Sequence, residues 1–191
     1  TTGASNTAVG MYALLANTTA SDNTAIGYAS LSANITGTRN VASGFRALQF
    51  NTTANDNTAT GYYALYANTT GASNVAVGSY ALDANTTASN STAVGYQALT
   101  ANTTGATNTA FGKGALLANT TGNTNVAVGA NALAANVDGD KSVAVGVDAL
   151  AAQDPASNVD MYNVAVGDSA GAAVTTGLQN TLIGGLAGDA L

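Results

Sequence analysis

The sequence has no cysteine, histidine, tryptophan or glutamate, and only one proline among its 191 residues. Without cysteine there are no disulfides and no thiolate metal ligands. Without histidine and cysteine the usual zinc sites and the base of a serine triad cannot be built. We therefore expect a protein that is not an enzyme and that has no catalytic residue, cofactor or metal site.

Charge is also scarce. Charged residues make up 7% of the chain, against about 25% in ordinary soluble domains. The net charge is −6, and phosphate binding needs basic patches, so we expect no nucleic-acid partner. No apolar run approaches the roughly 18 residues of a membrane helix, so we expect no membrane span in this segment.

Small and polar residues dominate instead, and the same pattern returns at every seventeenth position. The consensus is N-T/V-A-V-G-Y-x-A-L-x-A-N-T-T-G/A-x-x. All steps have this length except a longer one, by four positions, between Ser142 and Asn163. The units open at Asn6, Asn23, Asn40, Asn57, Asn74, Ser91, Asn108, Asn125, Ser142, Asn163 and Asn180.

This period is too short for helical repeats, which need about 33 residues or more, and it suits one coil of a β-solenoid. We predict an all-β parallel solenoid of about eleven coils. It forms a single domain over residues 1–191, a fragment of a longer fibre protein. Each coil should hold two short strands, N-T-A-V-G and A-L-x-A, with Asn-Thr-Thr-Gly at a corner.

The fifth residue of each coil is glycine in all eleven units. An unbroken glycine column indicates a backbone that is bent or closely approached by another backbone. The column consists of Gly10, Gly27, Gly44, Gly61, Gly78, Gly95, Gly112, Gly129, Gly146, Gly167 and Gly184.

Large apolar residues occupy mainly the fourth position, as in Val9 and Ile26, and the ninth, which is Leu in the first nine coils. We expect both columns to be buried. Burying one such side chain contributes about 1.5–3 kcal/mol, whereas ordering each backbone residue costs about 1 kcal/mol or more. Two side chains per coil make a thin core, so we predict that the chain packs with copies of itself as a parallel homotrimer.

Units such as Asn74-Val-Ala-Val-Gly-Ser-Tyr-Ala-Leu resemble the YadA-like head repeats of trimeric autotransporter adhesins and the related repeats of phage tail fibres. The resemblance implies a left-handed parallel β-roll, three chains around an axis, and a role in adhesion. It implies an extracellular location on a virion tail fibre or a bacterial surface, with a host glycan or protein receptor as a partner. The repeat of this chain is longer than the usual head repeat, and the extra positions fall at the Asn-Thr-Thr corner.

Aromatic residues gather at the sixth and seventh positions and should form a stripe along the stack. The stripe could bind glycans through its ring faces or pack against a neighbouring chain, and we favour packing. Its members are Tyr12, Tyr28, Phe45, Tyr62, Tyr63, Tyr80 and Tyr96.

The Asn-x-Thr triplets could be glycosylation acceptors. Because they recur once per coil, we favour a ladder of stacked amides that hydrogen-bond from coil to coil. The asparagines are Asn17, Asn34, Asn51, Asn68, Asn85, Asn102 and Asn119, with Asn90 in a further triplet.

Two acidic patterns could carry chemistry. Asp138-Gly139-Asp140 could belong to a calcium loop, but the further acids of such a loop are missing, so we favour a polar corner. A glycosidase needs two placed carboxylates. Asp22, Asp56 and Asp83 lie coils apart, so a glycan-binding fibre with depolymerase activity is a minor alternative.

The function that we expect is a non-enzymatic rigid spacer or receptor-contact shaft in a trimeric surface fibre. The alternative from another class is an ice-binding β-solenoid, since threonine-rich flat arrays are typical of those proteins.

The C-terminal third departs from the pattern. Residues 138–191 carry the whole net charge, the only proline, Pro155, and four extra residues before Asn163. Insertions in solenoids are usually loops on one face, so we expect residues 153–162 to form a loop. Gly171 and Gly188 replace the leucine column, and we expect the roll to narrow there.

Overall fold

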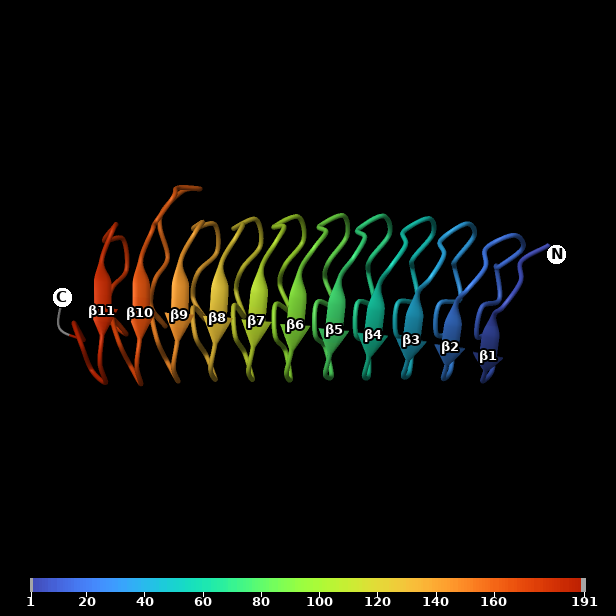
Figure 1. Ribbon diagram of the computed structural model, residues 1–191, viewed down its shortest axis with the longest axis horizontal. Coiled ribbons are helices and arrows are strands. Elements are labelled where there is room, and N and C mark those ends of the chain that lie inside the picture. Colours follow the sequence, from blue (N-terminus) through green and yellow to red (C-terminus); the bar gives the residue numbers. More distant parts are fainter. Residues whose placement is uncertain (1, 190–191) are drawn as a thin grey trace.

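The computed structural model describes residues 2–189 and shows a single parallel β-solenoid (Figure 1). Each coil contributes one strand, and the strands stand side by side in sequence order in one sheet. The strands are β1 Thr7–Val9, β2 Thr24–Ile26, β3 Val41–Ser43, β4 Thr58–Thr60, β5 Val75–Val77, β6 Thr92–Val94, β7 Thr109–Phe111, β8 Val126–Val128, β9 Val143–Val145, β10 Val164–Val166 and β11 Thr181–Ile183.

Neighbouring strands are paired so that equivalent positions of successive repeats lie side by side. Ala8 pairs with Ala25 and Ala42 with Ala59, so the same coil position is stacked along the whole sheet. The longer step is absorbed outside the sheet, because Ala144 still pairs with Ala165. The expected all-β solenoid with one repeat unit per coil is therefore confirmed.

The middle residue of each strand faces the interior. Ala25, Ala93 and Ala165 are fully buried. Because side chains alternate along a strand, the second and fourth residues of each coil point outward. The expectation that the fourth position is buried is wrong: Val9 is 57% exposed and Ile183 is 71% exposed. Each of these strands places only the small methyl group of alanine in the interior, so the interior is narrow there.

The expected second strand, A-L-x-A, is also wrong. Residues there form turns, and the seventh and ninth positions adopt left-handed backbone, with φ of 53° at Ala29 and 51° at Leu31. The chain has to turn back within a few residues, which an extended segment cannot do. Backbone hydrogen bonds still run between coils, for example from Leu31 N to Ala47 O at 3.0 Å.

One leucine per coil fills the interior. The column is fully buried from the second to the ninth coil, and its members are Leu31, Leu48, Leu65, Leu82, Leu99, Leu116, Leu133 and Leu150. In the tenth coil Gly171 replaces the leucine, and Leu182 replaces the usual strand alanine in the next coil. A Cβ on Gly171 would lie 2.6 Å from Leu182 Cδ1. The missing leucine is thus compensated by one from the strand side.

The asparagine ladder is confirmed. Asn68 Nδ2 donates to Asn51 Oδ1 at 3.0 Å, and Asn85 Nδ2 donates to Asn68 Oδ1 at 2.8 Å. The same Asn68 amide also donates to Gly71 O within its own corner. The ladder asparagines Asn34, Asn51, Asn68, Asn85, Asn102 and Asn119 are fully buried, so they hold the corners and are not accessible in the folded chain, whereas Asn90 is exposed.

The first position of each coil forms a second ladder. Asn40 N donates to Asn23 Oδ1 at 3.0 Å, and Asn57 N donates to Asn40 Oδ1 at 3.0 Å. These amides occupy the interior beside the alanines and the leucine. Much of the narrow interior is therefore polar but hydrogen-bonded, which avoids the cost of unpaired buried groups.

The chain leaves the stack within residues 153–162, before β10, where a loop projects in Figure 1. Both ends of this segment are anchored. Gln153 is fully buried and its Nε2 donates to Asn136 Oδ1 at 3.1 Å. Met161 is fully buried as well, and its N donates to Asp140 O at 3.0 Å. Only the middle of the segment is a surface loop.

Candidate binding surfaces

Exposed aromatic rings stack along the first half of the solenoid. The rings of Tyr28 and Phe45 are 5.2 Å apart between centroids, and those of Phe45 and Tyr62 are 5.3 Å apart, both pairs tilted by 12°. They occupy the sixth position of successive coils, and strand spacing of about 4.8 Å brings such residues into stacking range. Tyr28 and Phe45 each remain 38% exposed.

A second row of rings comes from the seventh position. Tyr63 and Tyr80 stack at 5.8 Å, and Tyr62 contacts Tyr63 at 4.6 Å, which joins the two rows. Tyr12 adds an edge contact to Tyr28 at 5.6 Å. The structure thus brings together six of the seven residues expected in the stripe.

Two further rings belong to the group, although the sequence reading missed them. The ring centroid of Tyr66 lies 4.6 Å from that of Tyr63, and the ring centroid of Phe50 lies 4.9 Å from that of Tyr66. They occupy the tenth and eleventh positions, outside the sixth and seventh positions at which the stripe was expected. Tyr96 makes no ring contact within residues 2–189. We call the other eight residues the aromatic cluster: Tyr12, Tyr28, Phe45, Phe50, Tyr62, Tyr63, Tyr66 and Tyr80.

Arg46 lies within the aromatic cluster. Its guanidinium carbon is 5.4 Å from the centroid of Phe45 and 5.9 Å from that of Tyr63, which is cation–π range. Nη1 donates to the Tyr63 hydroxyl at 3.3 Å. In the part of the chain that the structure describes, no carboxylate pairs with this guanidinium.

The other arginine is paired. Arg39 Nε donates to Asp56 Oδ1 at 2.6 Å and Nη2 donates to Oδ2 at 2.9 Å. This fork lowers the pKa of Asp56 below its ordinary value. Lys141 likewise donates to Asp160 at 2.7 Å and lowers the pKa of that carboxyl. Both pairs are exposed, so they contribute little to stability.

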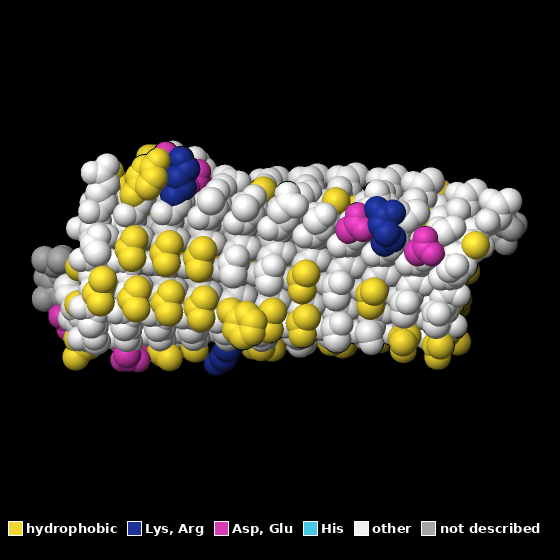
Figure 2. Space-filling model, in the orientation of Figure 1, with side chains coloured by type: hydrophobic (Ala, Val, Ile, Leu, Met, Phe, Trp, Pro, Cys, Tyr) yellow, Lys and Arg dark blue, Asp and Glu magenta, His cyan; other side chains and the backbone are white. Residues whose placement is uncertain are grey.

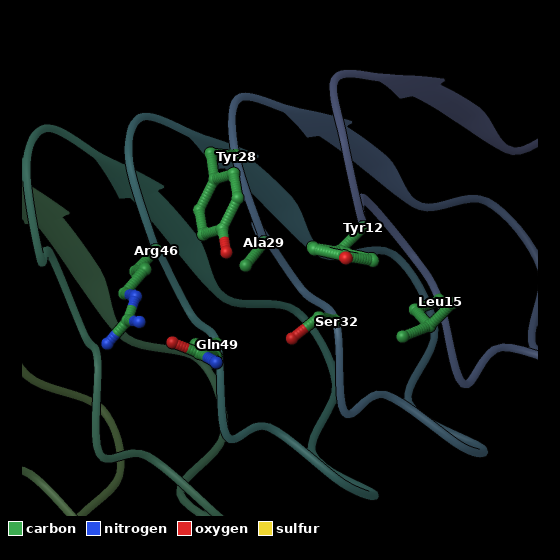
Figure 3. A pocket seen from close by; sticks show the side chains of 7 residues that line it. All are labelled: Tyr12, Leu15, Tyr28, Ala29, Ser32, Arg46 and Gln49. Carbon is green, nitrogen blue, oxygen red and sulfur yellow. The ribbon is translucent and has the colours of Figure 1, made fainter.

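A pocket of about 220 Å³ opens beside Arg46 (Figure 3). In Figure 3 the strands lie behind the labelled side chains, so the pocket is on the side of the coils opposite the sheet. Arg46 Nε and Gln49 Oε1 are buried in its wall without a hydrogen-bond partner. The pocket is lined by Tyr12, Leu15, Tyr28, Ala29, Ser32, Arg46 and Gln49.

The outward side chains of the sheet form a second surface, which we call the strand face: the second and fourth residues of every coil. In Figure 2 its apolar side chains form two rows, one from the fourth positions of β7–β11 and a shorter one from the second positions of β8–β10. Phe111 is 53% exposed at the start of these rows. Between β7 and β11 the rows consist of Phe111, Val126, Val128, Val143, Val145, Val164, Val166 and Ile183.

The Asp-Gly-Asp sequence acts as a corner. Asp138 Oδ1 accepts a hydrogen bond from Thr121 Oγ1 at 2.6 Å, and Asp140 Oδ1 accepts one from Asn123 N at 2.6 Å. Both carboxylates thus bind the preceding coil. Within residues 2–189 no three acidic side chains come together in a group that could hold a metal ion.

Comparison of the chain with protein-family models, with curated proteins and with solved structures gives no match. None of the described residues forms a helix long and apolar enough to cross a membrane.

Proposed function

We propose that this chain is a non-enzymatic, rigid segment of a homotrimeric surface fibre, of the phage tail-fibre or bacterial adhesin-head kind. It acts outside the cell as a spacer or receptor-contact shaft. The observation that carries the proposal is the strand face, whose exposed apolar side chains gather in rows over β7–β11 (Figure 2).

The strand face favours association of identical chains. Large exposed apolar patches mark interaction surfaces, and Val9, Phe111 and Ile183 are all more than half exposed in the single chain. Copies in parallel orientation would place the same rows at the same height. The interior supports this view, because only one leucine per coil is buried and much of the rest is alanine and asparagine.

The solenoid also suits a mechanical role. Hydrogen bonds join neighbouring coils at the strand, at the turns and through both asparagine ladders. Eleven coils at about 4.8 Å each give a straight rod of roughly 50 Å. A rod cross-linked at every coil can hold a contact surface away from the particle that bears it.

The test is the mass of the folded protein in solution, measured by light scattering. We expect three chains, and we expect Val145→Asp in the strand face to weaken the assembly by introducing charge into the apolar rows. Val147→Asp is the matched control, because the sixth position already holds Asp168 in the next coil. A wild-type protein that is a stable folded monomer would overturn the proposal.

Ice binding is the second candidate, and the regularity of the strand face favours it. The face is an in-register array in which the second position is either threonine or valine while the fourth is mostly β-branched. We rank it below the fibre because β8, β9 and β10 have Val at both outward positions and the doubled threonines lie at the corners.

A further inference from the structure

The pocket beside Arg46 has the composition of a small-ligand site. Ligand pockets combine apolar and aromatic walls with a few polar groups that fix orientation. Here Tyr12 and Tyr28 provide exposed rings, and Arg46, Gln49 and Ser32 provide polar groups. Because the pocket lies on the side opposite the sheet (Figure 3), it stays open if the strand face is covered by other chains.

The aromatic rings suit a sugar. A pyranose ring presents C–H groups on its faces and hydroxyls at its edge, so it stacks on an aromatic ring while its hydroxyls reach polar partners. Tyr12 is 50% exposed and Tyr28 is 38% exposed, with centroids 5.6 Å apart. The cluster continues past the pocket through Phe45 and Tyr62, which extends the surface beyond one sugar unit.

Arg46 adds a preference for an acid. Its guanidinium is held by two rings and one hydroxyl, and it has no carboxylate partner among the described residues. A guanidinium recognises a carboxylate through paired hydrogen bonds. It is the only charged side chain lining the pocket, so no acid of the protein competes for it there.

The pocket wall contains polar atoms that the protein leaves unpaired. Arg46 Nε and Gln49 Oε1 are both buried without a partner, and such groups are costly and rare in folded proteins. Figure 3 shows the Gln49 oxygen end turned toward Arg46. Among the described residues these two atoms are the only buried side-chain nitrogen or oxygen atoms without a partner, which sets this wall apart from the rest of the solenoid.

The charge of the chain does not oppose an acidic ligand at this end. Residues 1–137 contain three aspartates against three basic residues and are neutral, whereas residues 138–191 carry the net −6. The pocket and the whole aromatic cluster lie in the neutral part. A carboxylated ligand would therefore meet the least repulsion along the first coils.

From these observations we propose that the pocket and the adjoining aromatic cluster bind a carboxylated saccharide, with Arg46 holding the carboxylate and Tyr12 and Tyr28 stacking on the sugar. This names a ligand class for the fibre proposed above and rests on that function for its biological role. It replaces our expectation that the rings pack against a neighbouring chain.

The test is calorimetric titration of the chain with tri-galacturonic acid and, separately, with its methyl ester. We expect the acid to bind and the ester to bind at least about tenfold more weakly, because only the acid can pair with a guanidinium. We expect Arg46→Gln to remove this difference. The variant should fold, since Gln97 occupies the same coil position with φ of 56°.

Two further variants separate stacking from charge. Tyr28→Ser, which copies Ser79 at the same coil position, should weaken both ligands alike. Lys113→Ala removes the same charge away from the pocket and copies Ala130 of the next coil, so it should change nothing. Absence of binding, or equal loss in Lys113→Ala and Arg46→Gln, would overturn the proposal.

Light scattering on the same samples keeps this test apart from that of the proposed function. Binding by a chain that does not form trimers would support the saccharide site and contradict the trimeric fibre. A trimer that binds neither ligand would support the trimeric fibre and contradict the saccharide site.

Discussion

Left-handed backbone recurs in every coil, at the fifth, seventh, ninth and seventeenth positions. Three of these positions accept ordinary side chains, because their φ lies near 50–60°, as in Tyr63 at 58° and Leu65 at 50°. That region costs an L-residue about 1–2 kcal/mol but is allowed. The fifth position differs: φ is 138° at Gly95, a conformation that side chains rarely adopt.

The lack of space around the fifth position also requires glycine. A Cβ on Gly95 would lie 2.5 Å from Gly112 O and 2.6 Å from Gly112 C. The expected close approach of backbone to backbone is therefore confirmed. Glycine is needed there for two separate reasons, conformation and contact.

We predict that Gly95→Val lowers the free energy of unfolding by about 3 kcal/mol or more, from strain and overpacking together. Tyr96→Ser is the control, because Ser79 stands at the same place one coil earlier. Thermal unfolding followed by circular dichroism measures both. Equal melting temperatures for the two variants and the parent would contradict this account of the column.

The repeating structural element of this protein is the coil. The insertion in the ninth coil shows which positions of a coil keep their place when residues are added. The sheet keeps its register across the longer step, with Val143 still paired to Val164. Gln153 takes the asparagine position, and Met161 and Tyr162 rejoin the corner, since Tyr162 has the φ of 51° that the seventeenth position requires. The added length therefore lies between Pro155 and Asp160, and Val159 O at its end accepts a hydrogen bond from Asp140 N at 2.9 Å.

We predict that deleting Ala156–Val159, which restores the ordinary step, leaves the melting temperature close to that of the parent. Deleting Val159–Tyr162 restores the same step but removes the buried Met161, and should destabilise the protein by about 2–5 kcal/mol. Thermal unfolding of the two deletions compares them directly. If both unfold alike, the anchoring role assigned to Met161 is wrong.

At the scale of the whole molecule, the solenoid separates two surfaces. The strand face carries the apolar rows, and the aromatic cluster with its pocket lies on another side of the coils. A fibre can use the first for assembly and the second for contact, without either interfering with the other. An ice-binding protein would instead need its flat strand face open to water.

This difference predicts the behaviour of the protein in freezing solution. Because we expect the strand face to be covered by other chains, the wild-type protein should leave ice-crystal shape unchanged and show no thermal hysteresis at high concentration. Nanolitre osmometry measures both. Faceted crystals would reverse the ranking of the two candidate functions.

The period, the parallel stack, the in-register columns and the requirement for Gly95 and its counterparts could all be predicted from the sequence. These features repeat in every coil, so each is visible many times in one chain. The asparagine ladder could be predicted for the same reason. Most of the aromatic cluster could also be predicted, because rings at the sixth position of successive coils stack on one another, and so do rings at the seventh.

Which columns face the interior could not be predicted, because it depends on how the parts of a coil pack against one another. The alternation of N-T-A-V-G is compatible with either face inside, and Val is more apolar than Ala, so the sequence favoured burying Val9 and its counterparts. The interior is narrow, however, because Leu31 and its counterparts reach across it from the turns on the opposite side. Opposite a leucine the strand has room only for alanine, and Leu182 fits where Gly171 replaces that leucine. The valines therefore face outward, where other chains can cover them.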